Sequence, residues 1–98
     1  MMFIDLNWEG TWIMTIKHHV HEVEDGLHMI RCSGTVEGPN FFDKFDYECE
    51  KYMAPSGDPQ GPHSLNIRYG GCLPEYIETN VADNLNEITD RWVQDNFI

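Results

Sequence analysis

Histidines and one cysteine gather around a single predicted turn, and imidazole and thiolate are ligands that Zn²⁺ prefers. His19 and His21 precede the pair Asp25-Gly26, and His28 and Cys32 follow it. Asp-Gly favours a two-residue hairpin loop, because such a loop needs positive φ, which glycine tolerates. With that loop, His19 lies directly opposite Cys32, and all four side chains share one face of the hairpin. The sequence therefore predicts a candidate metal site on this face.

Other interpretations of these residues remain open. Their spacing matches no established zinc motif, so they are also explained by a row of polar residues on a solvent-facing or partner-facing strand. A third interpretation is a pH switch, in which protonation of several histidines weakens binding to a basic partner. The opposite face of the hairpin is the better candidate for the core, although it also carries His18. Its apolar side chains are Trp12, Met14, Ile16, Val20, Leu27 and Met29.

Carboxylates dominate the chain as a whole. It has 17 acidic residues against six Lys and Arg, a formal net charge of -11 on 98 residues. Three of the acids alternate along one side of a predicted strand, and three recur at helical spacing. These two predicted rows are Asp46, Glu48 and Glu50, and Asp83, Glu87 and Asp90.

The functional interpretation of the two rows is a decoy surface. A polyanion repels nucleic acid and anionic lipid and steers basic proteins toward itself. Arg and Lys of a partner would pair with carboxylates in place of phosphates, because the same geometry serves both. The expected partner is a basic nucleic-acid-binding protein or complex, without direct binding to nucleic acid or membrane. The alternative is a solvated surface that keeps a small protein soluble.

The composition carries a resemblance at the level of class. In size and charge the chain is similar to small phage-encoded inhibitors of CRISPR complexes, and to bacterial immunity proteins that block basic nuclease toxins. This likeness covers no motif. It implies an inhibitor that acts as a DNA mimic.

Catalytic chemistry has less support. Cys72, with His63 upstream, offers a thiol and a base, but no third group and no family signature accompany them. Acidic pairs are so abundant that none stands out as a general acid and base. The sequence therefore predicts a non-enzymatic protein without a cofactor.

A sheet and a helix must position these side chains. Period-two alternation and turn residues predict strands over 12–24, 27–36, 41–53 and 64–69, with a further short strand within 1–8. In the third of these, the side chains predicted to face the dry side are Phe41, Phe45, Tyr47, Cys49 and Met53. Those predicted to face water are Phe42, Lys44, Asp46, Glu48, Glu50 and Tyr52.

The C-terminal part is predicted to be helical. It opens at Pro74-Glu75 or is capped by Asn80, and its apolar stripe consists of Ile77, Val81, Leu85, Ile88 and Trp92. We expect one α+β domain over residues 1–98, with an antiparallel four- to five-stranded meander packed on one face by the helix.

Location and assembly follow from the remaining features. No apolar run approaches the roughly 18 residues that span a bilayer, and the N-terminus lacks the pattern of a signal peptide. Three widely spaced cysteines favour reduced thiols in a cytoplasm. An exposed strand edge offers a route to a homodimer by sheet extension. Trp8, beside Glu9-Gly10, is a candidate interface anchor.

Overall fold

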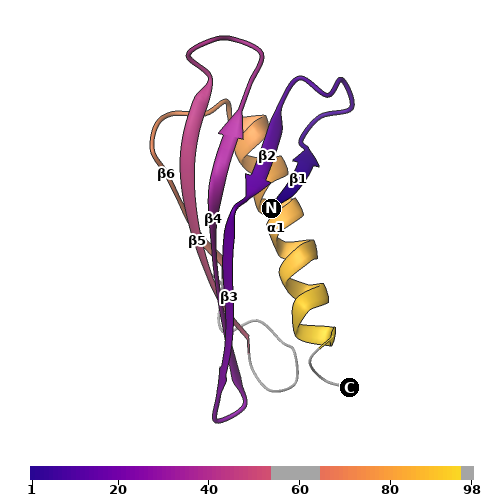
Figure 1. The fold of residues 1–98 in the computed structure, drawn as a ribbon, viewed down its shortest axis with the longest axis vertical. Coiled ribbons are helices and arrows are strands. Elements are labelled where there is room, and N and C mark those ends of the chain that lie inside the picture. The colour runs from indigo at the N-terminus through magenta and orange to yellow at the C-terminus, as the bar shows by residue number, and fades with distance from the viewer. Residues whose placement is uncertain (54–64, 96–98) are drawn as a thin grey trace.

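The chain folds into two layers, an antiparallel sheet and one helix that lies across it (Figure 1). The computed structural model describes residues 1–53 and 65–95. Its elements are β1 (Met2–Asp5), β2 (Ile13–Ile16), β3 (His18–Glu24), β4 (Leu27–Glu37), β5 (Lys44–Met53), β6 (Leu65–Tyr69) and α1 (Glu75–Asp95). The strands pair in the order β1-β2-β4-β5-β6, and β3 continues the line of β2 along β4. The predicted α+β class, the meander and the covering helix are confirmed.

The β3–β4 hairpin closes with the predicted two-residue loop. Asp25 and Gly26 have φ of 52° and 81°, both positive, as a type I′ turn requires. His19 lies opposite Cys32, so the predicted register is confirmed.

A β-bulge at Lys17 reverses the faces of the strand that leads into this hairpin. Met14 lies opposite Val36, whereas His18 lies opposite Ser33, so the β2–β3 side has one residue more than β4 over this stretch. The Lys17 N–H also donates to the Ser33 carbonyl at 2.9 Å. Because side chains alternate with period two, every residue after the bulge changes face.

The prediction of the core face is therefore correct for the residues that precede the bulge and wrong for those that follow it. Met14 and Ile16 are buried, but Val20 is 50% exposed. On β4 the buried side chains are even-numbered, apart from Thr35, and they include His28, so the odd-numbered Met29 points away from the helix. The histidine face, not the Val20 face, is the one that packs toward α1.

β5 alternates as predicted, with odd-numbered side chains toward α1 and even-numbered ones outward. It begins at Lys44, because the chain first makes a turn closed by a hydrogen bond from the Gly38 N–H to the Asp43 carbonyl at 2.7 Å. Phe41 and Phe42 are exposed in that turn, so the prediction of Phe41 on the dry side is wrong. Residue 64, predicted to open the next strand, lies outside the described residues.

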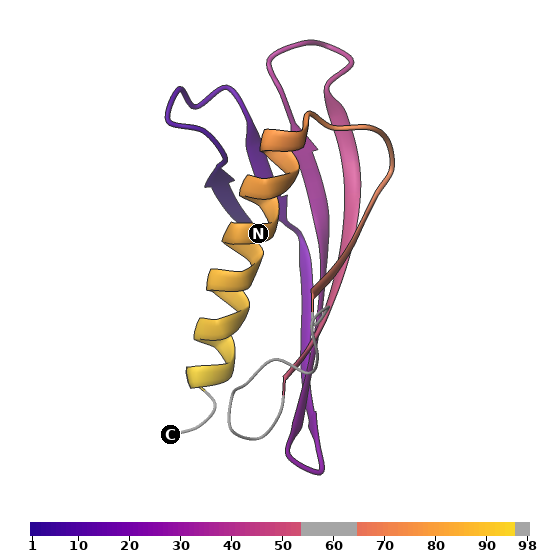
Figure 2. The same cartoon turned by 180° about the vertical axis from the view of Figure 1, so that it is seen from behind.

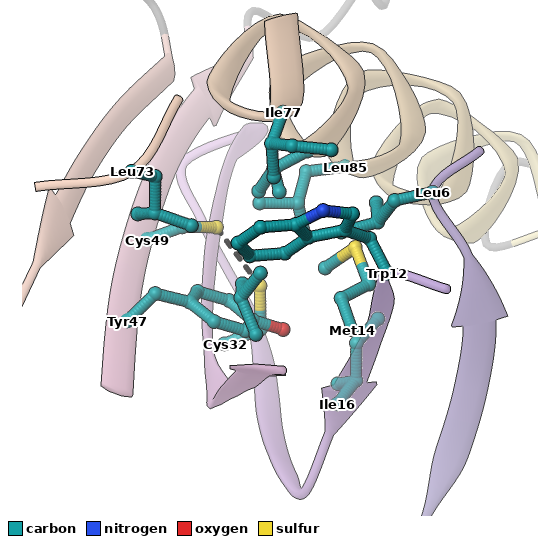
Figure 3. Close-up of a cluster of buried hydrophobic side chains, with 12 residues drawn as sticks. Leu6, Trp12, Met14, Ile16, Cys32, Tyr47, Cys49, Leu73, Ile77 and Leu85 are labelled. Atoms are coloured by element: carbon teal, nitrogen blue, oxygen red, sulfur yellow. Dashed lines mark hydrogen bonds between the residues drawn. The ribbon is translucent and has the colours of Figure 1, made fainter. Parts of the chain in front are cut away.

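α1 begins at Glu75, the first of the two predicted starts, and Asn80 lies inside the helix rather than capping it. The Asn80 side-chain amide instead donates to the Leu6 carbonyl at 2.7 Å, which ties the helix to the β1–β2 loop. The buried side of α1 packs on the inner face of the sheet in a core that includes Trp12 and Tyr47 (Figure 3). Burial of this side of α1 therefore holds the helix and the sheet together.

Candidate functional site

The predicted sheet row lies on the outer face of β5, where Asp46, Glu48 and Glu50 are exposed. Basic side chains flank it on both sides. Arg31 lies opposite Glu50, with its Nε 3.9 Å from Oε1, and Arg68 lies opposite Glu48. A shallow depression of about 230 Å³ on this face is lined in part by Arg31, Glu48 and Glu50. The row is therefore a strip of mixed charge rather than an uninterrupted polyanion.

The predicted helix row is shorter than expected. Asp83 and Glu87 are exposed on α1, and Glu87 Oε1 pairs with Arg91 Nη2 at 2.7 Å. Asp90 is only half-exposed and binds the Lys51 ammonium between helix and sheet. The prediction of an outward carboxylate is wrong for Asp90, because a buried cation on β5 holds it toward the sheet.

Lys51 is the charged residue that the sequence pattern did not identify. It occupies an inward position of β5, and its side chain is 3% exposed. Its Nζ donates to Asp90 Oδ1 at 2.8 Å and to Asn86 Oδ1 at 3.0 Å. A buried ammonium is tolerated when it is paired and hydrogen-bonded, so Lys51 links the two layers. Its burial could have been predicted from its odd-numbered position, which it shares with the inward residues of β5.

The two predicted rows lie on opposite sides of the molecule. α1 covers one face of the sheet, so its outer side and the outer face of β5 point in opposite directions (Figures 1 and 2). A single flat partner surface cannot contact both rows. The structure does not bring them together.

Uncompensated charge is greatest on the helix. α1 contains six carboxylates and one arginine. Over residues 1–53 and 65–95, which hold 16 of the 17 acids and all six bases, four carboxylates form ion pairs with Lys or Arg. Twelve of the 16 therefore have no basic partner within these ranges.

The histidines predicted as metal ligands lie on the inner side of the sheet. The His19 ring stacks on Trp92, with centroids 4.6 Å apart and planes inclined by 22°. His21 Nε2 lies 2.8 Å from Nδ1 of the buried His28. Burial lowers the pKa of His21, and the charges of His28 and His19 lower it further. The lowered pKa favours the neutral form of His21, and all three rings are engaged with neighbouring side chains.

Cys32, the fourth predicted ligand, contacts a second cysteine. Its Sγ lies 2.8 Å from Sγ of Cys49, the residue directly opposite on β5. The hydrogen bond to Cys49 and burial both raise the pKa of the Cys32 thiol, which disfavours a thiolate ligand. In the part of the chain that the structure describes, no three His, Cys, Asp or Glu side chains form a metal-binding group.

The predicted thiol and base pair is only partly described. Cys72 is exposed after β6, and His63 lies outside the described residues. The nucleophile hypothesis therefore gains no geometric support.

Exposed aromatic side chains occupy the end of the molecule opposite the β3–β4 hairpin, where the β1–β2 loop and the β4–β5 turn lie (Figure 1). Trp8 in the loop is 94% exposed, and Phe41 and Phe42 in the turn are 92% and 86% exposed. The two phenylalanine rings meet edge to face, with centroids 5.3 Å apart. Aromatic residues are frequent anchors of protein interfaces. The expected exposure of Trp8 and of Phe42 is confirmed, whereas Phe41 was predicted on the dry side because alternation assigned this turn to a strand.

No protein-family model, curated protein or solved structure matches this chain significantly. In the described ranges, no helix combines the length and apolarity that a bilayer crossing requires. The surfaces above are therefore the basis for a functional proposal.

Proposed function

We propose that this chain is a non-enzymatic binding protein that occupies the basic surface of a partner, in the place that nucleic acid otherwise takes. The observation that supports this is the net charge of -11 carried on a two-layer body. Twelve described carboxylates without a basic partner remain available to Arg and Lys from another molecule. Such a field speeds the encounter with a cationic partner.

The outer side of α1 is the better contact surface of the two rows. The sheet row is flanked by Arg31 and Arg68, which compete with a partner's cations for its carboxylates. On α1, Arg91 is the one base, and it pairs with Glu87, while Asp83 keeps an exposed carboxylate. We therefore assign the first contact to the helix and a secondary role to the sheet row.

Competition with nucleic acid follows from shared chemistry. A guanidinium binds a carboxylate or a phosphate through the same pair of N–H donors. Salt screens exposed charges beyond about 10 Å at 0.1 M, so binding should weaken as salt rises. The exposed aromatic end offers an apolar contact that salt does not weaken.

The histidine cluster does not support a second function. His19 is stacked on Trp92, His21 and His28 are joined through ring nitrogens, and Cys32 contacts Cys49. A metal would have to displace these contacts before it could bind.

The test compares two variants with equal change of charge on opposite faces, Asp83→Lys/Glu87→Lys and Asp46→Lys/Glu48→Lys. Each is immobilised in full length, and proteins retained from an extract of the source cells are identified by mass spectrometry. We expect the wild-type chain to retain nucleic-acid-binding proteins that added duplex DNA releases. The helix variant should lose most of this capture, and the sheet variant should lose less.

The sheet variant is the matched control, since both variants move the net charge by the same amount. Equal losses in both would show a general effect of charge and contradict the assignment to α1. Retention of the same proteins by both variants, insensitive to DNA and salt, would overturn the electrostatic proposal itself.

A further inference from the structure

Two of the three cysteines meet in the core, directly across from each other on neighbouring strands. Cys32 of β4 and Cys49 of β5 form a registered pair, and both are buried, at 4% and 2% exposure. Their sulfur atoms lie 2.8 Å apart on the inner face of the sheet, beneath α1 (Figure 3). Cys72 is exposed elsewhere. The fold thus selects one pair of thiols out of three.

The backbone geometry suits a covalent bond between them. Residues directly opposite in an antiparallel pair have Cα atoms about 4.5–5.5 Å apart, within the roughly 4.4–6.8 Å range of disulfides. Both side chains leave the strands on the same face, since Cys32 and Cys49 belong to the same core cluster. The register therefore places the two cysteines at a separation that a disulfide can span.

We propose that Cys32 and Cys49 are a dithiol–disulfide site that is oxidised by a small-molecule disulfide of the glutathione type. One protein thiolate attacks a sulfur of the oxidant, whose S–S bond breaks, and the first thiol product leaves. The second protein thiolate attacks the protein sulfur of this mixed disulfide and releases the second thiol. Two protein thiols are oxidised and one small disulfide is reduced, and the two protons end on the released thiols.

Burial decides when this exchange takes place. Neither sulfur is open to a tripeptide while α1 covers the sheet, so attack occurs before the layers close or when the helix transiently opens. Once formed, the bond is shielded from external thiols by the same cover. It joins β4 to β5 next to Tyr47, inside the main core cluster.

The experiment uses full-length Cys72→Ser, which removes the exposed thiol and leaves the buried pair. The protein is equilibrated with a mixture of reduced and oxidised glutathione, once folded and once in urea, and free thiols are then alkylated. Trypsin cleaves after Arg31, Lys44 and Lys51, so the two cysteines fall in separate peptides, 32–44 and 45–51. Mass spectrometry of the linked pair therefore reports the bond directly.

We expect the ratio of disulfide to dithiol to be at least about tenfold higher in the folded protein than in urea, because folding holds the sulfurs together. An equal or lower ratio in the folded protein would overturn the proposal. As a second measurement, the oxidised protein should unfold at higher urea concentration than the reduced one, and a lower midpoint would also overturn it. Cys49→Ala in the same background is the control, since it can form glutathione adducts but no linked peptides.

Discussion

At the scale of single residues, one buried ammonium joins the helix to the sheet. Lys51 has three N–H donors, of which Asp90 and Asn86 accept two. Asp90 is half-exposed, with 47% of its side chain accessible, so water shares in its solvation, whereas Lys51 depends on its protein partners. The pair is therefore more sensitive to loss of the carboxylate than to loss of the cation.

This asymmetry gives a prediction. Asp90→Ala should lower the free energy of unfolding by about 2 kcal/mol, because it leaves a buried cation with one partner fewer. Lys51→Met, which replaces the cation with an apolar chain of similar length, should cost less than about 1 kcal/mol. Urea denaturation measures both.

Asp83→Ala is the control for this prediction, as an exposed acid on the same helix with an expected effect within about 0.5 kcal/mol. If Asp90→Ala costs no more than Asp83→Ala, the buried ammonium does not rely on that carboxylate.

Residue patterns predicted the environment of most site residues but not their tertiary partners. Asp90 follows Asp83 by two helical turns, so spacing alone puts both on one side of α1. The cation that draws Asp90 inward is 39 residues away in sequence, and no local pattern records it. The Cys32–Cys49 contact was missed for a related reason, since it depends on the register of β4 with β5, which no turn signal specified.

At the scale of elements, the bend between β2 and β3 depends on a close approach of two backbones. A Cβ placed on Gly34 would lie 1.9 Å from the carbonyl oxygen of Thr15, which is backbone and cannot rotate away. The absence of a side chain at this position lets β2 pack against β4 beside the bulge.

Gly34→Ala should therefore lower the free energy of unfolding by about 2–3 kcal/mol, because the strands must move apart. Gly70→Ala is the matched control, since its added Cβ would meet its nearest atom at 3.5 Å, an ordinary contact. Thermal and urea unfolding of the two variants compare the costs. Similar losses of stability in the two variants would mean that a side chain at position 34 does not force β2 and β4 apart.

An element could be predicted from the sequence where the residues that determine its geometry lie within the element itself. Asp25 and Gly26 set the β3–β4 register through their own φ angles, so the sequence was sufficient there. The bulge at Lys17 involves residues of ordinary extended type, and only the pairing with Ser33 reveals it. For that reason the meander and the helix were predicted correctly, while the inner and outer faces of β3 were exchanged.

At the scale of the whole molecule, the net charge of -11 opposes folding, since it concentrates like charges in a small volume. Raising sodium chloride from about 10 mM to about 300 mM should increase the midpoint of thermal unfolding by about 3–5 °C, because screening weakens this repulsion. Differential scanning calorimetry provides the measurement.

A variant with four exposed acids neutralised, Asp46→Asn/Glu48→Gln/Asp83→Asn/Glu87→Gln, is the comparison for the salt effect. Its midpoint should depend less on salt than that of the wild-type chain. A wild-type midpoint that stays constant or falls with added salt would show that favourable ion pairs outweigh the repulsion.

The placement of the three tryptophans makes the chain its own spectroscopic probe. Trp12 sits in the dry interior, Trp8 stands almost fully in water, and Trp92 rests against an imidazole. Indole emission shifts to shorter wavelength in apolar surroundings, so docking at the aromatic end would register most strongly through the exposed Trp8. Replacing each tryptophan in turn by phenylalanine would separate the emission changes at the aromatic end, in the core and beside His19. No attached dye would be needed.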